Sequence, residues 1–277
     1  MGHGRHGPKA RIMTPATITP AIEFRELSFA LPQGRLLLDR VSLAIEPGTT
    51  TALLGRSGSG KTTLLRTVNR MVEPTSGEVR VNGQNTQASN LIQLRRSIGY
   101  VIQETGLFPH FTVERNVGVV LEAMGSSRAE RIRRSHELLS TAGLDPATFA
   151  GRYPHQLSGG QRQRVGLARA LAADPEILLM DEPFGALDPL TRVEMQDMLR
   201  DLLARIRKTV LLVTHDLDEA LYLADRIAFL SEGKLIANLT PSEFLHSTEP
   251  EIAAYVSAFH RGVQFTKPEA ASQEASR

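Results

Sequence analysis

The segment Gly55–Thr62, with the sequence GRSGSGKT, restricts the fold of this chain more than any other part of it. It fits the pattern G-x-x-x-x-G-K-[ST], in which glycines let backbone N–H groups turn inward around a phosphate group. This arrangement needs a strand before the loop and a helix after it, whose N-terminus attracts the anion. Both are predicted, because Thr49–Leu54 (TTTALL) becomes apolar towards its end and Thr62–Met71 has a helical pattern. The sequence therefore predicts an α/β fold with a phosphate-binding loop at the end of a buried strand.

The chemistry of the side chains in this loop indicates a nucleotide as its ligand. Lys61 is expected to neutralise the β- and γ-phosphate oxygens, and the hydroxyl of Thr62 to coordinate Mg²⁺. A glycine-rich turn that binds no ligand is the alternative interpretation, but the strand and helix around the loop favour nucleotide binding. The expected ATP-binding residues of the loop are Gly55, Arg56, Ser57, Gly58, Ser59, Gly60, Lys61, Thr62 and Thr63.

Strands alternate with helices along most of the chain, which favours an α/β fold. Ile177–Met180 and Val210–Val213 are short and fully apolar, as is typical of strands inside a parallel sheet covered on both faces. Val113–Leu144 has a helical pattern, so a helical insertion is predicted between about residues 94 and 170. Further strands are predicted at Ile22–Phe29, Val41–Ile45, Val79–Val81, Arg226–Leu230 and Lys234–Leu239, and further helices at Gly159–Ala172, Met195–Ile206 and Leu217–Ala224.

The composition excludes several classes of site. The chain contains no cysteine, which excludes disulfides and thiolate metal sites. Its 32 Lys and Arg residues nearly balance 30 Asp and Glu residues, so no nucleic-acid partner is expected. No stretch approaches the roughly 18 consecutive apolar residues of a membrane-spanning helix. If the protein serves a membrane, we expect it to dock there through other chains.

Two adjacent carboxylates, Asp181 and Glu182, follow the apolar segment Ile177–Met180. Ligands of open α/β sheets bind at this carboxyl edge of the strands. Because neighbouring strand residues point to opposite sides, one carboxylate can face a metal ion and the other an attacking water molecule. We expect Asp181 to hold Mg²⁺ through a water molecule and Glu182 to act as the general base. A solvated acidic pair is the alternative.

The segment Leu157-Ser-Gly-Gly-Gln161 resembles the LSGGQ signature of the ABC-type ATPases. The resemblance covers about residues 22–240, and the other motifs of that family occur in the family's order. They are the phosphate loop Gly55–Thr62, a Q-loop glutamine at Gln103, the signature, the pair Asp181–Glu182, a D-loop at Gly185–Asp188, and a switch histidine at His215.

The resemblance implies an ABC nucleotide-binding domain, an α/β P-loop NTPase core with an antiparallel β subdomain and a helical insertion. We expect an ATPase domain over 21–245 and a short C-terminal helix and tail over 246–277. The first residues are basic and lack the apolar centre of a secretory signal, so residues 1–20 are expected to form a flexible tail. Ser158 and Gly160 lie at the start of a predicted helix, where hydroxyl, N–H groups and helix dipole can address an anion. In the family, this segment caps the ATP held by the partner subunit of a head-to-tail homodimer. The expected ATP-binding residues of the signature are Ser158, Gly159, Gly160 and Gln161.

Four further site residues follow from the family's pattern. Gln103 is expected to contact Mg²⁺ and the lytic water, and His215 to sense the γ-phosphate and help position that water. Asp188 of the D-loop is expected at the nucleotide. Phe29 falls where the family usually has an aromatic residue that stacks on adenine, although a role in the core is nearly as plausible for it.

A single cassette without its own membrane segment resembles the ATPase subunits of bacterial importers. Such a subunit would sit at the cytoplasmic face of the inner (plasma) membrane, bound to integral membrane permease subunits and served indirectly by a substrate-binding protein. Ile98–His110, Val68–Gly77 and Met180–Pro189 resemble importers of the osmoprotectants glycine betaine, choline and carnitine. About 35 residues follow Thr240, too few for the paired regulatory domains of some relatives.

Two other functions stay open. The first is an importer ATPase for another small solute, such as an amino acid or an anion, because much of the sequence of the three segments named above is shared among such importers. The second is a soluble ABC ATPase of DNA repair or translation. Repair members carry coiled-coil or zinc insertions and translation members carry two cassettes, and neither feature occurs in this chain.

Overall fold

A computed structural model of the chain describes residues 19–103 and 105–264. The tail expected at residues 1–20, apart from Thr19 and Pro20, lies outside the described residues, as does the end of the chain from residue 265.

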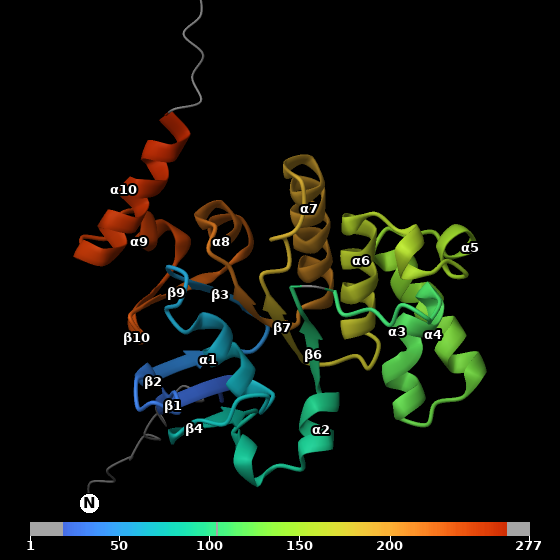
Figure 1. Cartoon of the computed structure of the whole chain (residues 1–277), viewed down its shortest axis with the longest axis horizontal. Helices are drawn as coiled ribbons and strands as arrows, with labels where there is room; N and C mark the ends of the chain where they lie inside the picture. Colours follow the sequence, from blue (N-terminus) through green and yellow to red (C-terminus); the bar gives the residue numbers. More distant parts are fainter. Residues whose placement is uncertain (1–18, 104, 265–277) are drawn as a thin grey trace, which may run out of the picture.

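The centre of the molecule is a six-stranded sheet with the strand order β10-β9-β3-β8-β7-β6 (Figure 1). Strands β9 to β6 run parallel to one another, and β10 is antiparallel at one edge. Every residue of β3, β7 and β8 is buried, as the apolar segments in the sequence indicated. The strands are β3 (Thr50–Leu54), β6 (Ile98–Val101), β7 (Ile177–Asp181), β8 (Thr209–Val213), β9 (Arg226–Ser231) and β10 (Lys234–Leu239).

A second, antiparallel sheet has the order β2-β1-β4-β5 and confirms the expected antiparallel subdomain. Its strands are β1 (Ile22–Ala30), β2 (Leu36–Ile45), β4 (Ser76–Val81) and β5 (Gln84–Asn85). The β2 strand starts earlier than the expected Val41 because its first residues pair with the end of β1, which the local pattern does not reveal.

Helix α1 (Lys61–Val68) lies between the two sheets and joins their cores. Its buried apolar residues Leu64, Leu65 and Val68 pack with side chains of both sheets. The helix begins at Lys61, directly after Gly60, whose φ of 98° is in the left-handed region. It ends at Val68, three residues before the expected Met71. The phosphate loop therefore connects a buried strand to a helix whose apolar residues are buried.

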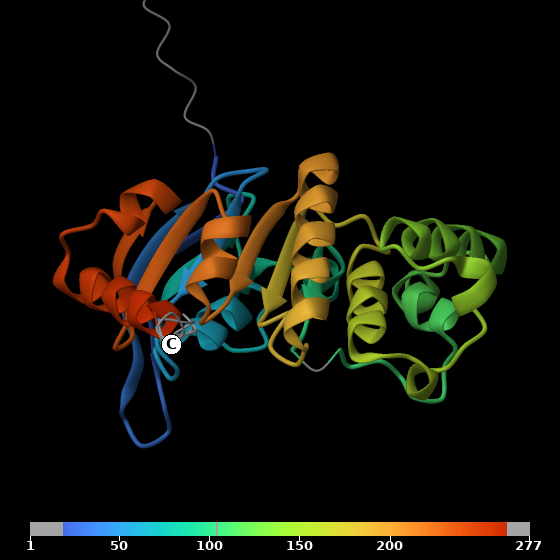
Figure 2. The same cartoon turned by 90° about the horizontal axis from the view of Figure 1, so that it is seen from above.

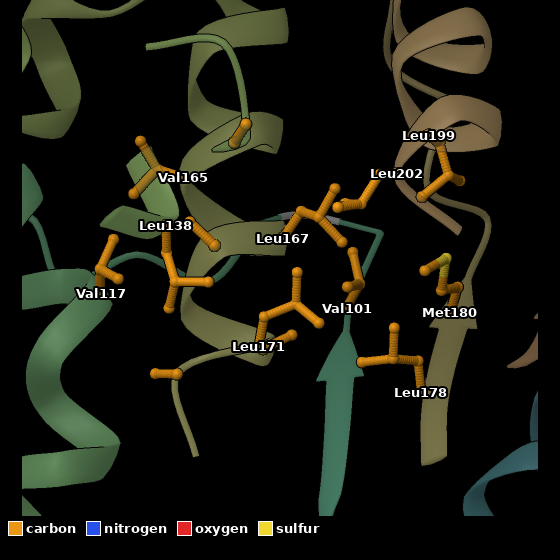
Figure 3. Close-up of a cluster of buried hydrophobic side chains, with 14 of the residues drawn as sticks. Val101, Val117, Leu138, Val165, Leu167, Leu171, Leu178, Met180, Leu199 and Leu202 are labelled. Carbon is orange, nitrogen blue, oxygen red and sulfur yellow. The ribbon is translucent and has the colours of Figure 1, made fainter. Parts of the chain in front are cut away.

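The predicted helical insertion is present, but the segment from residue 94 does not begin it. Residues 98–101 form β6, which pairs with β7 inside the core sheet. After β6 come the helices α3 (Val113–Ala123), α4 (Arg128–Thr141), α5 (Pro146–Phe149) and α6 (Gly159–Ala170), while α2 (Leu91–Arg96) precedes it. Figure 3 shows how this region is fastened to the core, because Leu167 and Leu171 of the α6 region lie between Val117 and Leu138 on one side and Val101 and Leu178 on the other.

The remaining helices are α7 (Pro189–Ile206), α8 (Leu217–Leu223), α9 (Pro241–Leu245) and α10 (Pro250–Gln264). Residues of α8, α9 and α10 share a separate hydrophobic cluster with β3 and β9, so the C-terminal helices belong to the same body as the sheet (Figures 1 and 2). None of the helices that the structure describes is long and apolar enough to cross a membrane. The predicted α/β core with an antiparallel β subdomain and a helical insertion is confirmed.

Candidate nucleotide site

The loop between β3 and α1 folds around the ammonium group of its own lysine. The Nζ atom of Lys61 donates to the carbonyl oxygens of Gly55 at 2.8 Å and Arg56 at 2.9 Å. Lys61 is buried, and this burial lowers its pKa, although the nearby charges of Glu182 and Asp181 act in the opposite direction. A cationic group buried in a loop of inward-turning backbone is suited to an anion that adds negative charge beside it.

Ser59 indicates that the loop is shaped for a further oxygen-bearing group. Its side chain is buried, yet its Oγ atom has no hydrogen-bond partner. A buried hydroxyl without a partner is unfavourable, typically by about 1–3 kcal/mol. A phosphate oxygen in the loop would supply the missing partner, so the residues present fit a nucleotide phosphate.

Thr62 and Asp181 are brought together from α1 and β7. The hydroxyl of Thr62 donates to Oδ1 of Asp181 at 2.8 Å. Mg²⁺ prefers oxygen ligands and is commonly held by one or two carboxylates together with substrate phosphates. Among the described residues, no three His, Asp or Glu side chains form a group that could hold a metal by themselves. The Thr62–Asp181 pair therefore fits Mg²⁺ that is held jointly with nucleotide phosphates.

The other oxygen of Asp181 has two partners that the sequence reasoning missed. Arg66 contacts Oδ2 at 3.2 Å, and the hydroxyl of Tyr100 donates to the same atom at 3.3 Å. Arg66 also donates to the Tyr100 hydroxyl at 3.3 Å. One signal was available, because Arg66 lies four residues after Thr62 and so on the same face of α1. The contribution of Tyr100 depends on the pairing of β6 with β7, which is not visible in the sequence.

Glu182 adopts a backbone conformation that is uncommon for its residue type. It follows β7 with a φ of 46°, in the left-handed region. Such non-glycine conformations cluster at functional sites, where surrounding structure enforces them. Its N–H donates to the Val213 carbonyl at 3.0 Å. Strand alternation therefore does not set the direction of the Glu182 carboxylate, because Glu182 lies beyond the end of β7 in left-handed backbone.

The carboxylate of Glu182 meets the two other residues that were expected near the lytic water. Its Oε2 atom lies 3.4 Å from Nε2 of Gln103 and 3.4 Å from Nδ1 of His215. These residues come from the end of β6, the end of β7 and the end of β8. The structure thus gathers the predicted base, glutamine and histidine at the carboxyl edge of the sheet, where ligands of such folds bind.

The segment around His215 is held on both sides while its ring is exposed. The N–H of Thr214 donates to the backbone carbonyl of Leu53, and its hydroxyl donates to the carboxylate of Glu219. Burial raises the pKa of this carboxylate. Asp216 caps the N-terminus of α8 by accepting from Asp218 at 2.8 Å. The side chain of His215 is 62% exposed. A fixed backbone with an exposed imidazole is suited to a group that acts on a bound ligand.

The signature segment forms the N-terminus of α6, beyond β6 and β7 as seen from α1 (Figures 1 and 2). Ser158 and Gln161 form a reciprocal capping box, which accounts for both side chains structurally. Gly160 has a packing reason as well, because a Cβ atom there would lie 2.5 Å from Thr191 of α7. Asp188 caps α7, and its hydrogen bonds with Thr191 lower the pKa of its carboxyl group.

Phe29 is placed against the core rather than on an open surface. It lies in β1 opposite Leu38, half-buried, and packs against the cluster formed by both sheets and α1. The cleft of about 790 Å³ beside the phosphate loop has Arg35, Leu36 and Leu37 among its lining residues, but not Phe29. The structure gives Phe29 a core role, and its contact with adenine stays a prediction.

Comparison with known proteins identifies the class. The family model described as ABC transporter matches residues 38–185. A solved structure described as a dimeric post-hydrolysis state of the ATP-binding cassette MJ0796 bound to ADP and Pi superimposes with a TM-score of 0.72 at 35% identity, covering 79% of this chain and 98% of that one. CbiO1 from Clostridium perfringens, part of an ABC transporter complex, gives 0.76 at 27% identity, covering 89% of this chain and 98% of that one. The chain belongs to the ABC transporter family and has the fold of its nucleotide-binding domain.

Several curated relatives are named as osmoprotectant importer subunits. The osmoprotectant import ATP-binding protein OsmV of Salmonella typhimurium is 48% identical, over 75% of this chain and 54% of the relative. The choline transport ATP-binding protein OpuBA of Bacillus subtilis is 42% identical, over 85% of this chain and 62% of the relative. The glycine betaine uptake ATP-binding protein YehX of Escherichia coli is 45% identical, over 81% and 72%. The chain thus spans just over half the length of the first two.

Proposed function

We propose that this protein is the ATP-hydrolysing subunit of a bacterial ABC importer for quaternary-amine osmoprotectants. The observation that carries the hydrolytic part is the meeting of Glu182 with Gln103 and His215 at 3.4 Å each, beside the Thr62–Asp181 pair. A base, an amide and an imidazole in one place can activate and position a water molecule for attack on a γ-phosphate.

In this proposal, the chain's own residues divide the work. The loop Gly55–Thr62 binds the phosphates, with Lys61 as the cation and Ser59 as a hydrogen-bond donor. Thr62, Gln103 and, through a water molecule, Asp181 would hold Mg²⁺, which would neutralise charge on the phosphate oxygens. Glu182 takes the proton from the attacking water, and His215 orients that water towards the γ-phosphate.

The protein works as a homodimer with two composite sites. Support comes from the position of the signature, because β6 and β7 lie between the N-terminus of α6 and α1, which carries the phosphate loop (Figure 1). An anion-binding helix end that is remote from its own loop is suited to a nucleotide held by a second subunit. Ser158–Gln161 and Asp188 of one subunit would then complete the site of the other. The relative MJ0796 is described as dimeric.

The names of the relatives support the proposed cargo, and the location is the one expected for a subunit of such an importer. OsmV, OpuBA and YehX are named for osmoprotectant, choline and glycine betaine transport respectively. We place this protein at the cytoplasmic face of the inner membrane, bound to permease subunits, with a substrate-binding protein delivering the solute. Two functions compete with this one. The first is an importer ATPase for an amino acid or an anion, and the second is a soluble ABC ATPase.

The hydrolytic part is tested by phosphate release from Mg²⁺-ATP. Glu182→Gln should keep nucleotide affinity but lose turnover by a factor of about 10² or more, because the base is gone. Glu46→Gln, the same change at an exposed position, is the matched control and should leave turnover unaltered. Unchanged turnover in Glu182→Gln would remove Glu182 from the role of base.

The transport part is tested in proteoliposomes containing this chain with the permease and binding protein encoded beside it. ATP-dependent uptake of radiolabelled glycine betaine, choline or carnitine is expected, and Glu182→Gln should abolish it. Uptake of an amino acid or anion instead would support the first alternative. A gene neighbourhood without any permease would support the soluble ATPase.

A further inference from the structure

The C-terminal helix α10 touches the segment that carries the proposed switch histidine. The hydroxyl of Tyr255, on α10, donates to the backbone carbonyl of His215 at 2.7 Å, across 40 residues of sequence. No motif in the sequence connects these two positions. The contact joins an element outside the nucleotide loops to the residue that faces Glu182.

Tyr255 is itself firmly placed. Its ring packs edge-on against Phe229 of β9 with 5.2 Å between ring centroids, and Phe229 also contacts Phe244 of α9. Ile252 and Val256, on either side of it on α10, are buried in the same cluster. Burial, reinforced by the negative charge of Asp216, raises the pKa of Tyr255 to about 12. The hydroxyl therefore keeps its proton at physiological pH and serves as a constant donor.

The bond fixes the peptide group between His215 and Asp216. The N–H of the same peptide group is held as well, because Asp216 donates it to the Thr214 hydroxyl at 3.0 Å. The peptide group before Thr214 is held by the bond from its N–H to the Leu53 carbonyl. The imidazole projects from this fastened backbone with most of its surface exposed. Its direction towards Glu182 therefore depends on the orientation of the backbone that Tyr255 holds.

We propose that Tyr255 is a positioning residue for hydrolysis, which acts through the His215 carbonyl to aim the His215 imidazole at the γ-phosphate edge of the site. This inference rests on the proposed ATPase function and deepens it. It makes α10 part of the hydrolytic apparatus, since a shift of this helix changes the backbone of His215 directly.

Tyr255→Phe removes the donor and keeps the ring, so α10 should stay packed. We expect kcat for ATP to fall by about fivefold, as for the loss of one hydrogen bond, with KM unchanged. The matched control is Tyr222→Phe, which removes a hydroxyl that donates to Asp197, away from His215. It should change kcat by less than about twofold. An unchanged kcat in Tyr255→Phe, or a rise in KM alone, would overturn the proposal.

A second measurement does not depend on turnover. In protein labelled with ¹³C at histidine, the His215 Cε1–Hε1 signal is assigned by its loss in His215→Ala. Tyr255→Phe should move this signal and Tyr222→Phe should leave it in place, with equal thermal midpoints for both variants. An unmoved signal in Tyr255→Phe overturns the link to His215 whether or not ATP is hydrolysed. Absence of hydrolysis by the wild-type protein would instead overturn the proposed function and the positioning role with it, and a moved signal would then leave only the structural link between Tyr255 and His215.

Discussion

Gly58 and Gly60 of the phosphate loop both have left-handed backbone, but only one of them is pressed against a neighbouring element. Their φ values are 79° and 98°. A Cβ atom at Gly58 would meet nothing within 4 Å. A Cβ atom at Gly60 would lie 2.6 Å from Cδ2 of Leu38 and 2.9 Å from the carbonyl oxygen of Leu37. Replacement by alanine should therefore separate backbone strain from steric conflict.

The magnitudes follow from these two surroundings. Left-handed backbone costs an L-residue about 1–2 kcal/mol, which applies to Gly58→Ala and Gly60→Ala alike. Overpacking adds about 1–3 kcal/mol, which applies to Gly60→Ala alone because the β2 strand is buried at Leu38. We thus expect a loss of free energy of unfolding of about 1–2 kcal/mol for Gly58→Ala and about 2–5 kcal/mol for Gly60→Ala.

Urea unfolding without nucleotide measures the difference. With a slope of about 3 kcal/mol per M, the midpoint should fall by about 0.3–0.7 M for Gly58→Ala and about 0.7–1.7 M for Gly60→Ala. Gly34→Ala, at a left-handed position in the turn before β2 with open space around it, should resemble Gly58→Ala. Equal midpoints for Gly58→Ala and Gly60→Ala would refute this reasoning, because Leu37 and Leu38 of β2 would then not be what excludes a side chain at Gly60.

Three further predictions concern ligand binding and pH. Ser158→Arg should abolish ATP-induced dimerisation of the Glu182→Gln protein, measured by light scattering, while nucleotide still binds the monomer. The control variant Ser127→Arg, at the capping position of α4, should dimerise normally. A dimer of the Ser158→Arg protein would contradict the composite site. Thr62→Val, which loses the hydroxyl beside Asp181, should need a higher Mg²⁺ concentration for ATP binding in a titration, and an unaltered titration would exclude Thr62 from the metal site. Because burial lowers the pKa of Lys61, the unfolded state binds its proton more tightly, so the free energy of unfolding should rise with pH up to the unfolded pKa of about 10.4. Urea unfolding at successive pH values should show that this rise is smaller in Lys61→Met, and identical profiles would contradict the buried charge.

The phosphate loop and the buried strands were accessible from sequence because their chemistry is local. Gly55–Thr62 is contiguous, and the apolar runs that became β7 and β8 can be satisfied only inside a covered sheet. The carboxyl ends of such strands meet at one edge, so the neighbourhood of Asp181, Glu182 and His215 could be inferred from the sequence alone.

Other features depended on contacts between distant segments. Strand alternation predicts that the Asp181 and Glu182 carboxylates point apart, but Glu182 lies beyond the end of β7 in left-handed backbone, where alternation no longer applies. The assignment of β6 to the core sheet required its pairing with β7, and the placement of the Phe29 ring required both sheets. Local propensity carries no information about such pairings.

By itself, the sequence determined that this protein has a phosphate loop between a strand and a helix, with carboxylates at the sheet edge. Backbone donors, glycine freedom and strand burial act within a few residues, so a contiguous motif specifies them. Only the tertiary structure decided which groups surround those residues: Arg66 and Tyr100 on Asp181, and Tyr255 on the carbonyl of His215. These contacts join segments far apart in the chain, and their geometry exists only once the sheet order and the packing of α10 are established.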